Sequence, residues 1–277
     1  MKAREKAFAF GLILCALLLA YSYAYLDAIL AVLSETVLGA GGVSASYLEA
    51  NSNLGYTCSA AILSLFYFWL WKRIKRGYPE KNATLAFRPF GGAFRMLLIG
   101  LGAGGVSLLW LNFAEAIQNS IPALQSSYDT FNSEMGAFEQ GDYIWMLLTV
   151  SVIGPLVEEL LFRGLVFHLF ERSFKSERTA IILSALLFGI WHEIFVQSVY
   201  TFMIGLILGY LYAKTRKIIW PFLVHLVNNF SGTLPPGFDG EFANLLVNLA
   251  SLICIPVLFI LLWRMEKNTK QIEKTLP

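Results

Sequence analysis

The chain has 277 residues, of which 57% are hydrophobic and only 14% are charged, and its formal net charge is +2. Soluble domains carry about 25% charged residues. The composition therefore excludes an ordinary soluble domain and indicates a protein whose main partner is the lipid bilayer. The basic residues flank apolar segments, where they face lipid headgroups, so we expect no nucleic-acid partner.

Apolar segments long enough to cross the roughly 30 Å hydrocarbon layer of a bilayer recur along the chain. Few segments alternate polar and apolar residues as the strands of a membrane β-barrel do. The pattern predicts an all-α, polytopic integral membrane protein whose helices surround a polar cavity. About eight transmembrane helices are expected, at residues 8–33, 55–71, 96–114, 144–171, 179–196, 199–213, 218–231 and 243–263, with a short interfacial helix near 124–135.

The distribution of lysine and arginine predicts the orientation of these helices. With eight spans, every Lys and Arg except Arg163 falls on one side of the membrane, whereas the loops 34–54, 115–143 and 232–242 contain neither residue. Loops rich in Lys and Arg face the cytoplasm. We therefore expect a multi-pass protein of the cell membrane with both termini in the cytoplasm.

Polar side chains interrupt three of the predicted spans. They form the patterns Glu158-Glu159-x-x-x-Arg163, Phe188-x-x-x-His192 and His225-x-x-x-Asn229. Burying such groups in lipid is costly unless they are paired or solvated. Ionisable residues inside a span therefore indicate a functional site.

The two adjacent glutamates have different surroundings along their own helix. Glu159 and Arg163 are four residues apart, so they share a helix face and can pair. Glu158 is rotated by about 100° from Glu159 and has no such partner. We interpret Glu158 as a general base and the Glu159–Arg163 pair as its structural support. The alternative, that Arg163 neutralises both carboxylates and neither takes part in chemistry, stays open.

The depth of the polar residues shows whether they can meet in the membrane. Counted from the basic residues that end their helices, Glu158 and His192 lie 14 residues deep, Asn229 lies 12 and His225 lies 8. At about 1.5 Å per residue, these depths span roughly 12–21 Å. Three separate helices thus place their polar groups in one band, which predicts a single site.

Two chemistries fit this set of side chains. In the first, Glu158 and His192 activate a water molecule, while His225 and Asn229 donate hydrogen bonds to the oxyanion of an amide under attack. In the second, Glu158, His192 and His225 bind Zn²⁺, with water as the open ligand. The HExxH spacing of many zinc proteases is absent, and no serine forms a comparable pair with a histidine. Zinc-dependent and metal-independent catalysis both stay open.

The three motifs, in this order on successive membrane helices, resemble the CPBP intramembrane proteases, the CAAX-protease and bacteriocin-processing family also called Abi. The resemblance covers residues 150–230. By position it implies two sets of site residues, catalytic Glu158, His192, His225 and Asn229 and supporting Glu159, Arg163 and Phe188. Members of this family are described both as metalloproteases and as metal-independent glutamate proteases, so the resemblance leaves the metal question open.

The resemblance divides the chain into N-terminal transmembrane helices and loops (1–140), catalytic helices (141–232), and a last helix with a cytoplasmic tail (233–277). We predict an endopeptidase that cleaves a membrane-associated protein or peptide by direct attack of an activated water, without an acyl-enzyme. The substrate is expected to enter from the cytoplasmic leaflet. The alternative is a non-proteolytic membrane protein, either an immunity or scaffold protein or a proton-coupled carrier that uses Glu158 as its relay.

Overall fold

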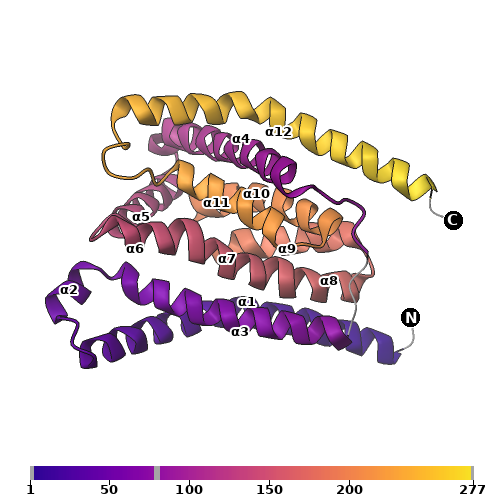
Figure 1. The fold of residues 1–277 in the computed structure, drawn as a ribbon, viewed down its shortest axis with the longest axis horizontal. Helices are drawn as coiled ribbons and strands as arrows, with labels where there is room; N and C mark the ends of the chain where they lie inside the picture. The colour runs from indigo at the N-terminus through magenta and orange to yellow at the C-terminus, as the bar shows by residue number, and fades with distance from the viewer. Residues whose placement is uncertain (1–2, 78–81, 276–277) are drawn as a thin grey trace.

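The computed structural model describes residues 3–77 and 82–275, and within these ranges the chain is helical with no strand (Figure 1). The α-helices are α1 (Ala3–Ala40), α2 (Ala45–Ala50), α3 (Asn53–Gly77), α4 (Pro89–Ile117), α5 (Pro122–Phe138), α6 (Tyr143–Met146), α7 (Gly154–Glu159), α8 (Phe167–Phe174), α9 (Glu177–Trp191), α10 (Phe195–Thr215), α11 (Ile219–Ser231) and α12 (Glu241–Thr275). A 3₁₀ turn at Gln118–Ser120 and π-helical segments at Leu147–Ile153 and Leu160–Val166 complete the described structure. The all-α prediction is confirmed, and α5 forms where a short helix was expected.

Six helical stretches are long and apolar enough to cross a membrane: Arg4–Ala40, Asn53–Gly77, Pro89–Ser120, Tyr143–Phe174, Phe195–Thr215 and Glu241–Ile272. The chain is therefore a multi-pass membrane protein, but the expected count of eight spans is not confirmed. The other two expected helices, α9 and α11, are present with only 15 and 13 residues. At about 1.5 Å per residue they are shorter than the hydrocarbon layer.

The residues that follow α9 explain why this helix is short. The helix was expected to continue to residue 196, but it ends at Trp191 with His192 as its C-cap. Glu193 then adopts a left-handed backbone conformation with a φ of 61°, which breaks the helical path before α10 begins. His192 therefore lies at a helix end rather than in the middle of a span.

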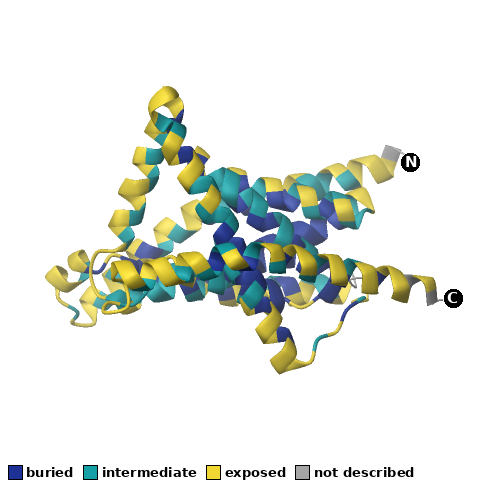
Figure 2. Ribbon diagram, turned by 90° about the horizontal axis from the view of Figure 1, so that it is seen from above, coloured by how far each residue is buried: buried dark blue, intermediate teal, exposed yellow. Residues whose placement is uncertain are grey.

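The helices form three layers (Figure 1). The pair α1 and α3 makes one outer layer and the pair α4 and α12 the other, while the stretch Tyr143–Phe174 lies between them with α9, α10 and α11. Buried residues concentrate in this middle layer, whereas the outer turns of α1 and α12 are exposed (Figure 2). Those turns carry large apolar side chains such as Phe10 and Phe242, as a surface in contact with lipid requires.

Small residues allow α4 to pack closely on α12. At Gly102 and Gly105 the main chain of α12, at Cys254 and Ser251, leaves no room for a Cβ atom. Glycine at such positions lets two membrane helices approach within van der Waals distance along their backbones. This contact fixes one wall of the bundle in which α11 is held.

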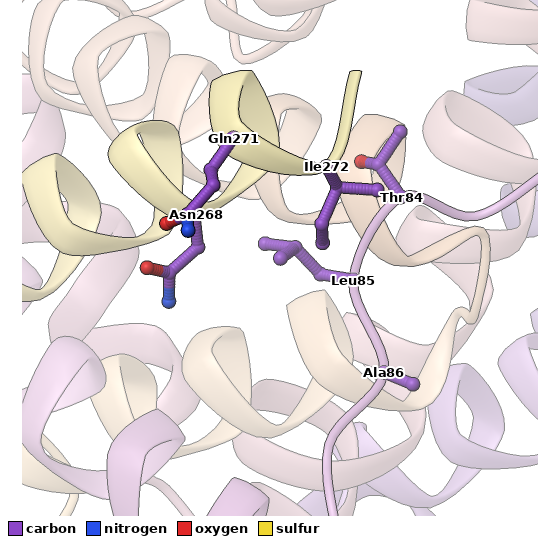
Figure 3. A pocket seen from close by; sticks show the side chains of 6 residues that line it. All are labelled: Thr84, Leu85, Ala86, Asn268, Gln271 and Ile272. Atoms are coloured by element: carbon purple, nitrogen blue, oxygen red, sulfur yellow. The ribbon is translucent and has the colours of Figure 1, made fainter. Parts of the chain in front are cut away.

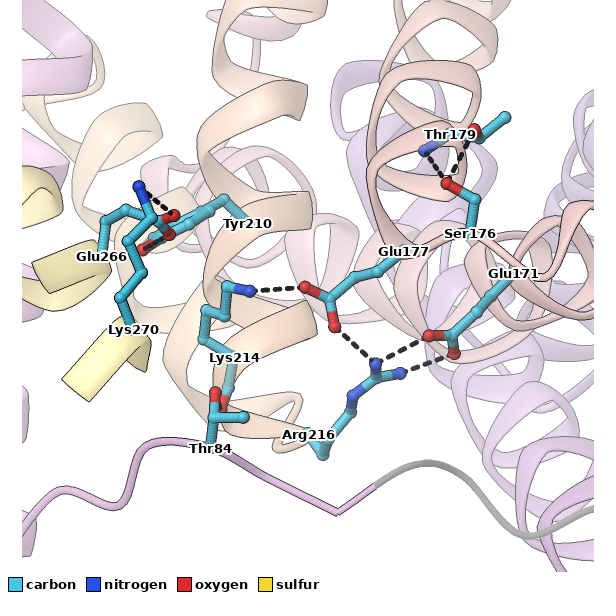
Figure 4. A network of polar contacts seen from close by, with 10 residues as sticks. All are labelled: Thr84, Glu171, Ser176, Glu177, Thr179, Tyr210, Lys214, Arg216, Glu266 and Lys270. Carbon is cyan, nitrogen blue, oxygen red and sulfur yellow. Dashed lines mark hydrogen bonds and ion pairs between the residues drawn. The ribbon is translucent and has the colours of Figure 1, made fainter. Parts of the chain in front are cut away.

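An ion-pair network joins α8, α9 and the end of α10 (Figure 4). We call Glu171, Glu177, Lys214 and Arg216 the α8–α10 network. Arg216 donates to both oxygens of Glu171 at 2.7 and 2.8 Å and to Glu177 at 3.0 Å, and Lys214 donates to Glu177 at 2.6 Å. Burial opposes the charge of Arg216, but hydrogen bonds and charges from Glu171 and Glu177 raise its pKa above the usual value.

Both described ends of the chain lie at the same end of the molecule as this network (Figure 1). The short helix α2 and the loop that joins α11 to α12 lie at the opposite end. The placement of the two termini on one side agrees with the positive-inside analysis. That this side is the cytoplasm stays a prediction.

Candidate active site

The first motif lies on the continuous helical stretch from Tyr143 to Phe174, in a place where the helix is irregular. The short α-helix α7 carries Glu158 and Glu159, and π-helical segments precede and follow it. Pro155 has no backbone N–H and so cannot continue regular α-helical hydrogen bonding, which accounts for the π segment before it. Such widened turns are common at functional sites because they redirect side chains. Here they flank Glu158 and Glu159.

Glu159 and Arg163 form the buried ion pair that their spacing predicts. Arg163 Nη1 donates to Glu159 Oε1 at 2.9 Å, and both side chains are 0% exposed. Arg163 also donates to the carbonyl of Gly205 on α10 at 3.3 Å. Its guanidinium lies over the ring of Phe188, 4.6 Å from the centroid, where cation–π attraction adds to the ion pair. The buried guanidinium thus has a carboxylate, a carbonyl and an aromatic ring as partners, while its Nε has no hydrogen-bond partner.

His225 lies between the two glutamates. Its Nδ1 is 2.9 Å from Glu159 Oε1, and its Nε2 is 3.7 Å from Glu158 Oε2. An ionised carboxylate only accepts hydrogen bonds, so the proton belongs on Nδ1 and Nε2 faces Glu158. The sequence did not predict this second role of Glu159, which orients the imidazole as well as pairing with Arg163.

Glu158 is the least constrained carboxylate of the motif. Its side chain is 17% exposed, and its only ion-pair contact in the described chain is the 3.7 Å approach to His225. Glu158 Oε2 has no hydrogen-bond partner. A buried carboxylate oxygen of this kind needs a donor such as water or a substrate group. The alternative in which Arg163 pairs with both glutamates does not match this geometry, because Arg163 pairs with Glu159 alone.

The second motif is organised by the ring of Phe188. His192 Nδ1 is 2.8 Å from the carbonyl oxygen of Phe188, to which it donates, so Nε2 is left for another contact. The Phe188 ring meets His192 edge to face at 4.7 Å and His225 at 5.8 Å between centroids. Phe188 therefore lies between the two imidazoles. No hydrogen bond or ion pair joins His192 to Glu158 within the described residues.

Asn229 follows His225 by one turn of α11 and bonds to the main chain. Its Nδ2 donates to the carbonyl of Val150 at 2.8 Å, and its Oδ1 accepts from Asn228 at 2.8 Å. Val150 lies in the first π-helical segment, so Asn229 satisfies a carbonyl where the helix is irregular. A carboxamide has two N–H donors, and its role at an oxyanion stays a prediction.

The described side chains do not form a metal site. No three His, Cys, Asp or Glu residues in the described ranges gather closely enough to hold an ion. Nδ1 of His192 is bonded to Phe188 O and Nδ1 of His225 to Glu159, which leaves Nε2 of each ring as the atom that could bind a metal. In this arrangement Glu158, His192 and His225 are not gathered into a preformed zinc site, and their role as ligands stays untested.

A surface cavity of about 440 Å³ lies elsewhere, between the segment before α4 and the end of α12 (Figure 3). Its lining contains none of the motif residues and consists of Thr84, Leu85, Ala86, Asn268, Gln271 and Ile272. These side chains carry no charge and no nucleophile suited to hydrolysis. The cavity is not part of the candidate active site.

One ionisable residue near the motif was not predicted from the sequence. Asp27 lies inside the first membrane-spanning stretch, and its charge acts on Glu158. The signal was present, since Asp27 is a carboxylate within the predicted 8–33 span. It forms no i,i+4 motif with another polar residue, however, and the hydropathy of the surrounding helix masks a single charge.

Comparison with known proteins identifies the region that carries the motifs. Residues 140–231 match the family described as Type II CAAX prenyl endopeptidase Rce1-like. The chain is 32% identical over 85 residues to the putative membrane peptidase YdiL of Bacillus subtilis (strain 168), which covers 30% of this chain and 34% of that protein. It is also 32% identical over 85 residues to the membrane-embedded CAAX protease MroQ of Staphylococcus aureus (strain USA300), covering 29% and 34%.

The matched region spans about a third of the length of these curated relatives. No solved structure matches the chain. The match to the endopeptidase family begins just before α6 and ends at the last residue of α11, so it contains all three motifs. The segment 140–231 is therefore similar to CAAX-protease-like membrane proteins over the region that carries the motifs.

Proposed function

We propose that the chain is an intramembrane endopeptidase that hydrolyses a peptide bond of a membrane-associated protein or peptide. The observation that carries the proposal is the set of contacts that Glu158 makes. This carboxylate lies in the middle of a span, close to His225, with an oxygen that has no hydrogen-bond partner and, unlike Glu159, with no arginine paired to it. The family of the segment 140–231 supports peptide hydrolysis as the reaction.

The proposed reaction begins with a water molecule between Glu158 and the substrate carbonyl. Glu158 accepts a proton from the water as its oxygen attacks the carbonyl carbon. His192 orients the water through Nε2, because Nδ1 is occupied by the carbonyl of Phe188. The C–N bond then breaks as the proton held by Glu158 passes to the leaving amine. No residue forms a covalent bond to the substrate in this scheme.

His225 and Asn229 are proposed to stabilise the oxyanion. His225 is proposed to act as an imidazolium that takes a proton from solvent on Nε2 before the attack, keeps it throughout and donates it as a hydrogen bond to the oxyanion, while Glu159 stabilises this charge through Nδ1. Asn229 uses one N–H on Val150 and has a second to offer. Glu159 and Arg163 are proposed as positioning residues, because both act on the substrate only through His225.

The topology supports a proposal for the direction of entry. We propose that both termini and the α8–α10 network lie in the cytoplasm, because this end carries the lysines and arginines. A substrate from the cytoplasmic leaflet would then approach the site past the ends of α8 and α10. Labelling of single cysteines introduced at Lys217 and at Asp239 with a membrane-impermeant maleimide tests the orientation, with Lys217 expected to be protected in intact cells.

The activity is tested by replacing Glu158 in the reconstituted protein. Glu158→Gln keeps the shape of the side chain and removes the base, so cleavage of a library of hydrophobic peptides should fall by about 10²–10⁴-fold. Glu35→Gln, a change on α1 away from the motif, serves as the control. Cleavage by Glu158→Gln at the wild-type rate would remove Glu158 as the base. No cleavage by the wild-type protein would favour a scaffold or a carrier.

The same assay tests the metal question. We propose that catalysis is independent of metal, because no three possible metal ligands among the described residues gather closely enough to hold an ion. Activity after prolonged chelation and gel filtration should stay within about twofold of the untreated enzyme, since no step uses an ion. Loss of activity on chelation, restored by Zn²⁺, would instead assign Glu158, His192 and His225 as zinc ligands.

A further inference from the structure

Asp27 is a carboxylate inside a membrane span that the proposed reaction does not use. It follows the buried Tyr23 by one turn of α1 and precedes the buried Ala31 by another. Residues at this spacing share one face of a helix, so Asp27 lies on the inward side of α1. A carboxylate held in an apolar span is costly unless it pairs or has a function.

The residues around Asp27 form a polar group between α1 and α3, and its hydroxyls are not all satisfied. We call Tyr23, Asp27, Ser59 and Tyr67 the α1–α3 polar cluster. Ser59 and Tyr67 are 0% exposed; the Tyr67 hydroxyl has no hydrogen-bond partner in the described chain, and the Ser59 hydroxyl has none besides its approach to Asp27. One oxygen of Asp27 is also buried without a partner. Buried polar groups in native proteins almost always have partners, so the cluster lacks a ligand.

The charge of Asp27 is not balanced by the chain itself. No Lys, Arg or His of the described ranges forms an ion pair with it. Arg163, the one basic residue in the middle of a span, pairs with Glu159. Asp27 and Glu158 also act on each other as like charges. A cationic group is one partner that would balance this charge.

Aromatic rings surround the cluster and connect it to the candidate active site. The ring of Tyr23 stacks on Tyr67 with centroids 6.4 Å apart and meets Trp191 edge to face at 5.0 Å. Trp191 in turn lies against His192, also at 5.0 Å. Aromatic faces attract ammonium and guanidinium groups. The cluster thus has the carboxylate and the aromatic rings that can recognise a cationic side chain. It contacts Trp191, the residue next to His192 in the sequence.

We propose that the α1–α3 polar cluster is a substrate subsite that binds the ammonium or guanidinium group of a lysine or arginine in the peptide to be cleaved. The proposal rests on the proposed peptidase function and adds a determinant of specificity to it. Asp27 forms the ion pair, and the hydroxyls of Ser59 and Tyr67 accept hydrogen bonds from the same group. The cation thereby fixes which peptide bond lies at Glu158.

Binding is measured first, separately from cleavage. The probes are dye-labelled peptides of about 20 Leu and Ala residues, each with a single Lys at one position, and a matching set with Gln. They are titrated in detergent micelles against Glu158→Gln protein, in which cleavage is not expected. One Lys position should bind more tightly than its Gln counterpart by on the order of 10-fold. Adding Asp27→Asn should remove this difference.

A matched control separates a specific site from general charge attraction. Glu35 lies two turns after Asp27 on α1, beside Gly55, and Glu35→Gln should leave the preference for Lys intact. Thermal unfolding of Asp27→Asn shows whether the variant is folded. A Lys preference that persists in folded Asp27→Asn, or no preference at any position, would overturn the proposal.

Cleavage assays then show whether the subsite or the peptidase function is wrong. In the wild-type background, Asp27→Asn should slow cleavage of the preferred Lys peptide by about 10-fold while leaving its Gln counterpart nearly unchanged. Equal rates for both peptides in wild type, with cleavage abolished by Glu158→Gln, would refute the subsite and keep the peptidase. Lys-dependent binding without any cleavage would keep the subsite and refute the peptidase.

Discussion

Two regions of the molecule place glutamates beside basic side chains, and they do so differently. In the α8–α10 network, each carboxylate forms contacts of 2.6–3.0 Å with Lys214 or Arg216. In the candidate active site only Glu159 is paired in this way, while Glu158 is 3.7 Å from His225. Similar residue types thus form a closed network in one place and an open one in the other.

The difference separates a structural role from a chemical one. A network in which each carboxylate is paired with a basic side chain gains from each hydrogen bond and leaves those carboxylates little capacity for another partner. A carboxylate that is held in place by its neighbours but not saturated can accept a proton or orient water. The α8–α10 network joins three helix ends, whereas Glu159 and Arg163 hold His225 beside an unsaturated Glu158.

The largest expected effect on stability comes from breaking the buried pair. Arg163→Met would leave Glu159 as an uncompensated charge at a site that is 0% exposed. Loss of one partner of a buried pair costs about 3–5 kcal/mol. We expect a clear fall in the thermal unfolding temperature in detergent, followed by circular dichroism, together with loss of peptide cleavage.

The double variant Glu159→Gln/Arg163→Met sharpens this prediction. It removes both charges, so much of the lost stability should return. Activity should stay low, because Gln at position 159 no longer stabilises a charged His225 as strongly as a carboxylate does. If Arg163→Met unfolds at the wild-type temperature, the pair is not the structural support described above.

A smaller effect is expected in the α8–α10 network. Arg216→Met removes the three hydrogen bonds to Glu171 and Glu177, and should lower stability by about 2 kcal/mol. The rate of cleavage per folded molecule should stay near that of wild type, because the network does not contact the candidate site. Lys217→Met, at an exposed neighbouring position, controls for the loss of one positive charge. A cleavage defect in folded Arg216→Met that Lys217→Met does not share would contradict this prediction and show that the network affects the candidate active site.

The sequence predicted what is local to a helix. Glu159 and Arg163 pair because they are one turn apart on the same helix. The common depth of the motifs also predicted correctly that Glu158 and His225 approach each other. Depth follows from the hydropathy pattern and from the basic residues at the helix ends, and both are readable without a structure.

The sequence could not predict how the helices are rotated about their axes. That rotation places Nδ1 of His225 on Glu159 and its Nε2 beside Glu158, and it depends on side-chain packing between helices. The end of α9 at Trp191 and the π segments around α7 were also missed, because hydropathy does not distinguish α from π hydrogen bonding. Asp27 was missed because it forms no charged i,i+4 pair on α1, while Ser59 and Tyr67 of its cluster lie on α3.

The central claim is that Glu158 and His225 act in one site, Glu158 on the attacking water and His225 on the oxyanion that the attack creates. It is tested most directly by a double-mutant cycle on kcat/KM with Glu158→Gln, His225→Gln and the two combined. Residues that act as a unit have strongly non-additive effects. We predict that the double variant is about as inactive as Glu158→Gln alone. Losses that multiply across the two single variants would contradict a shared site.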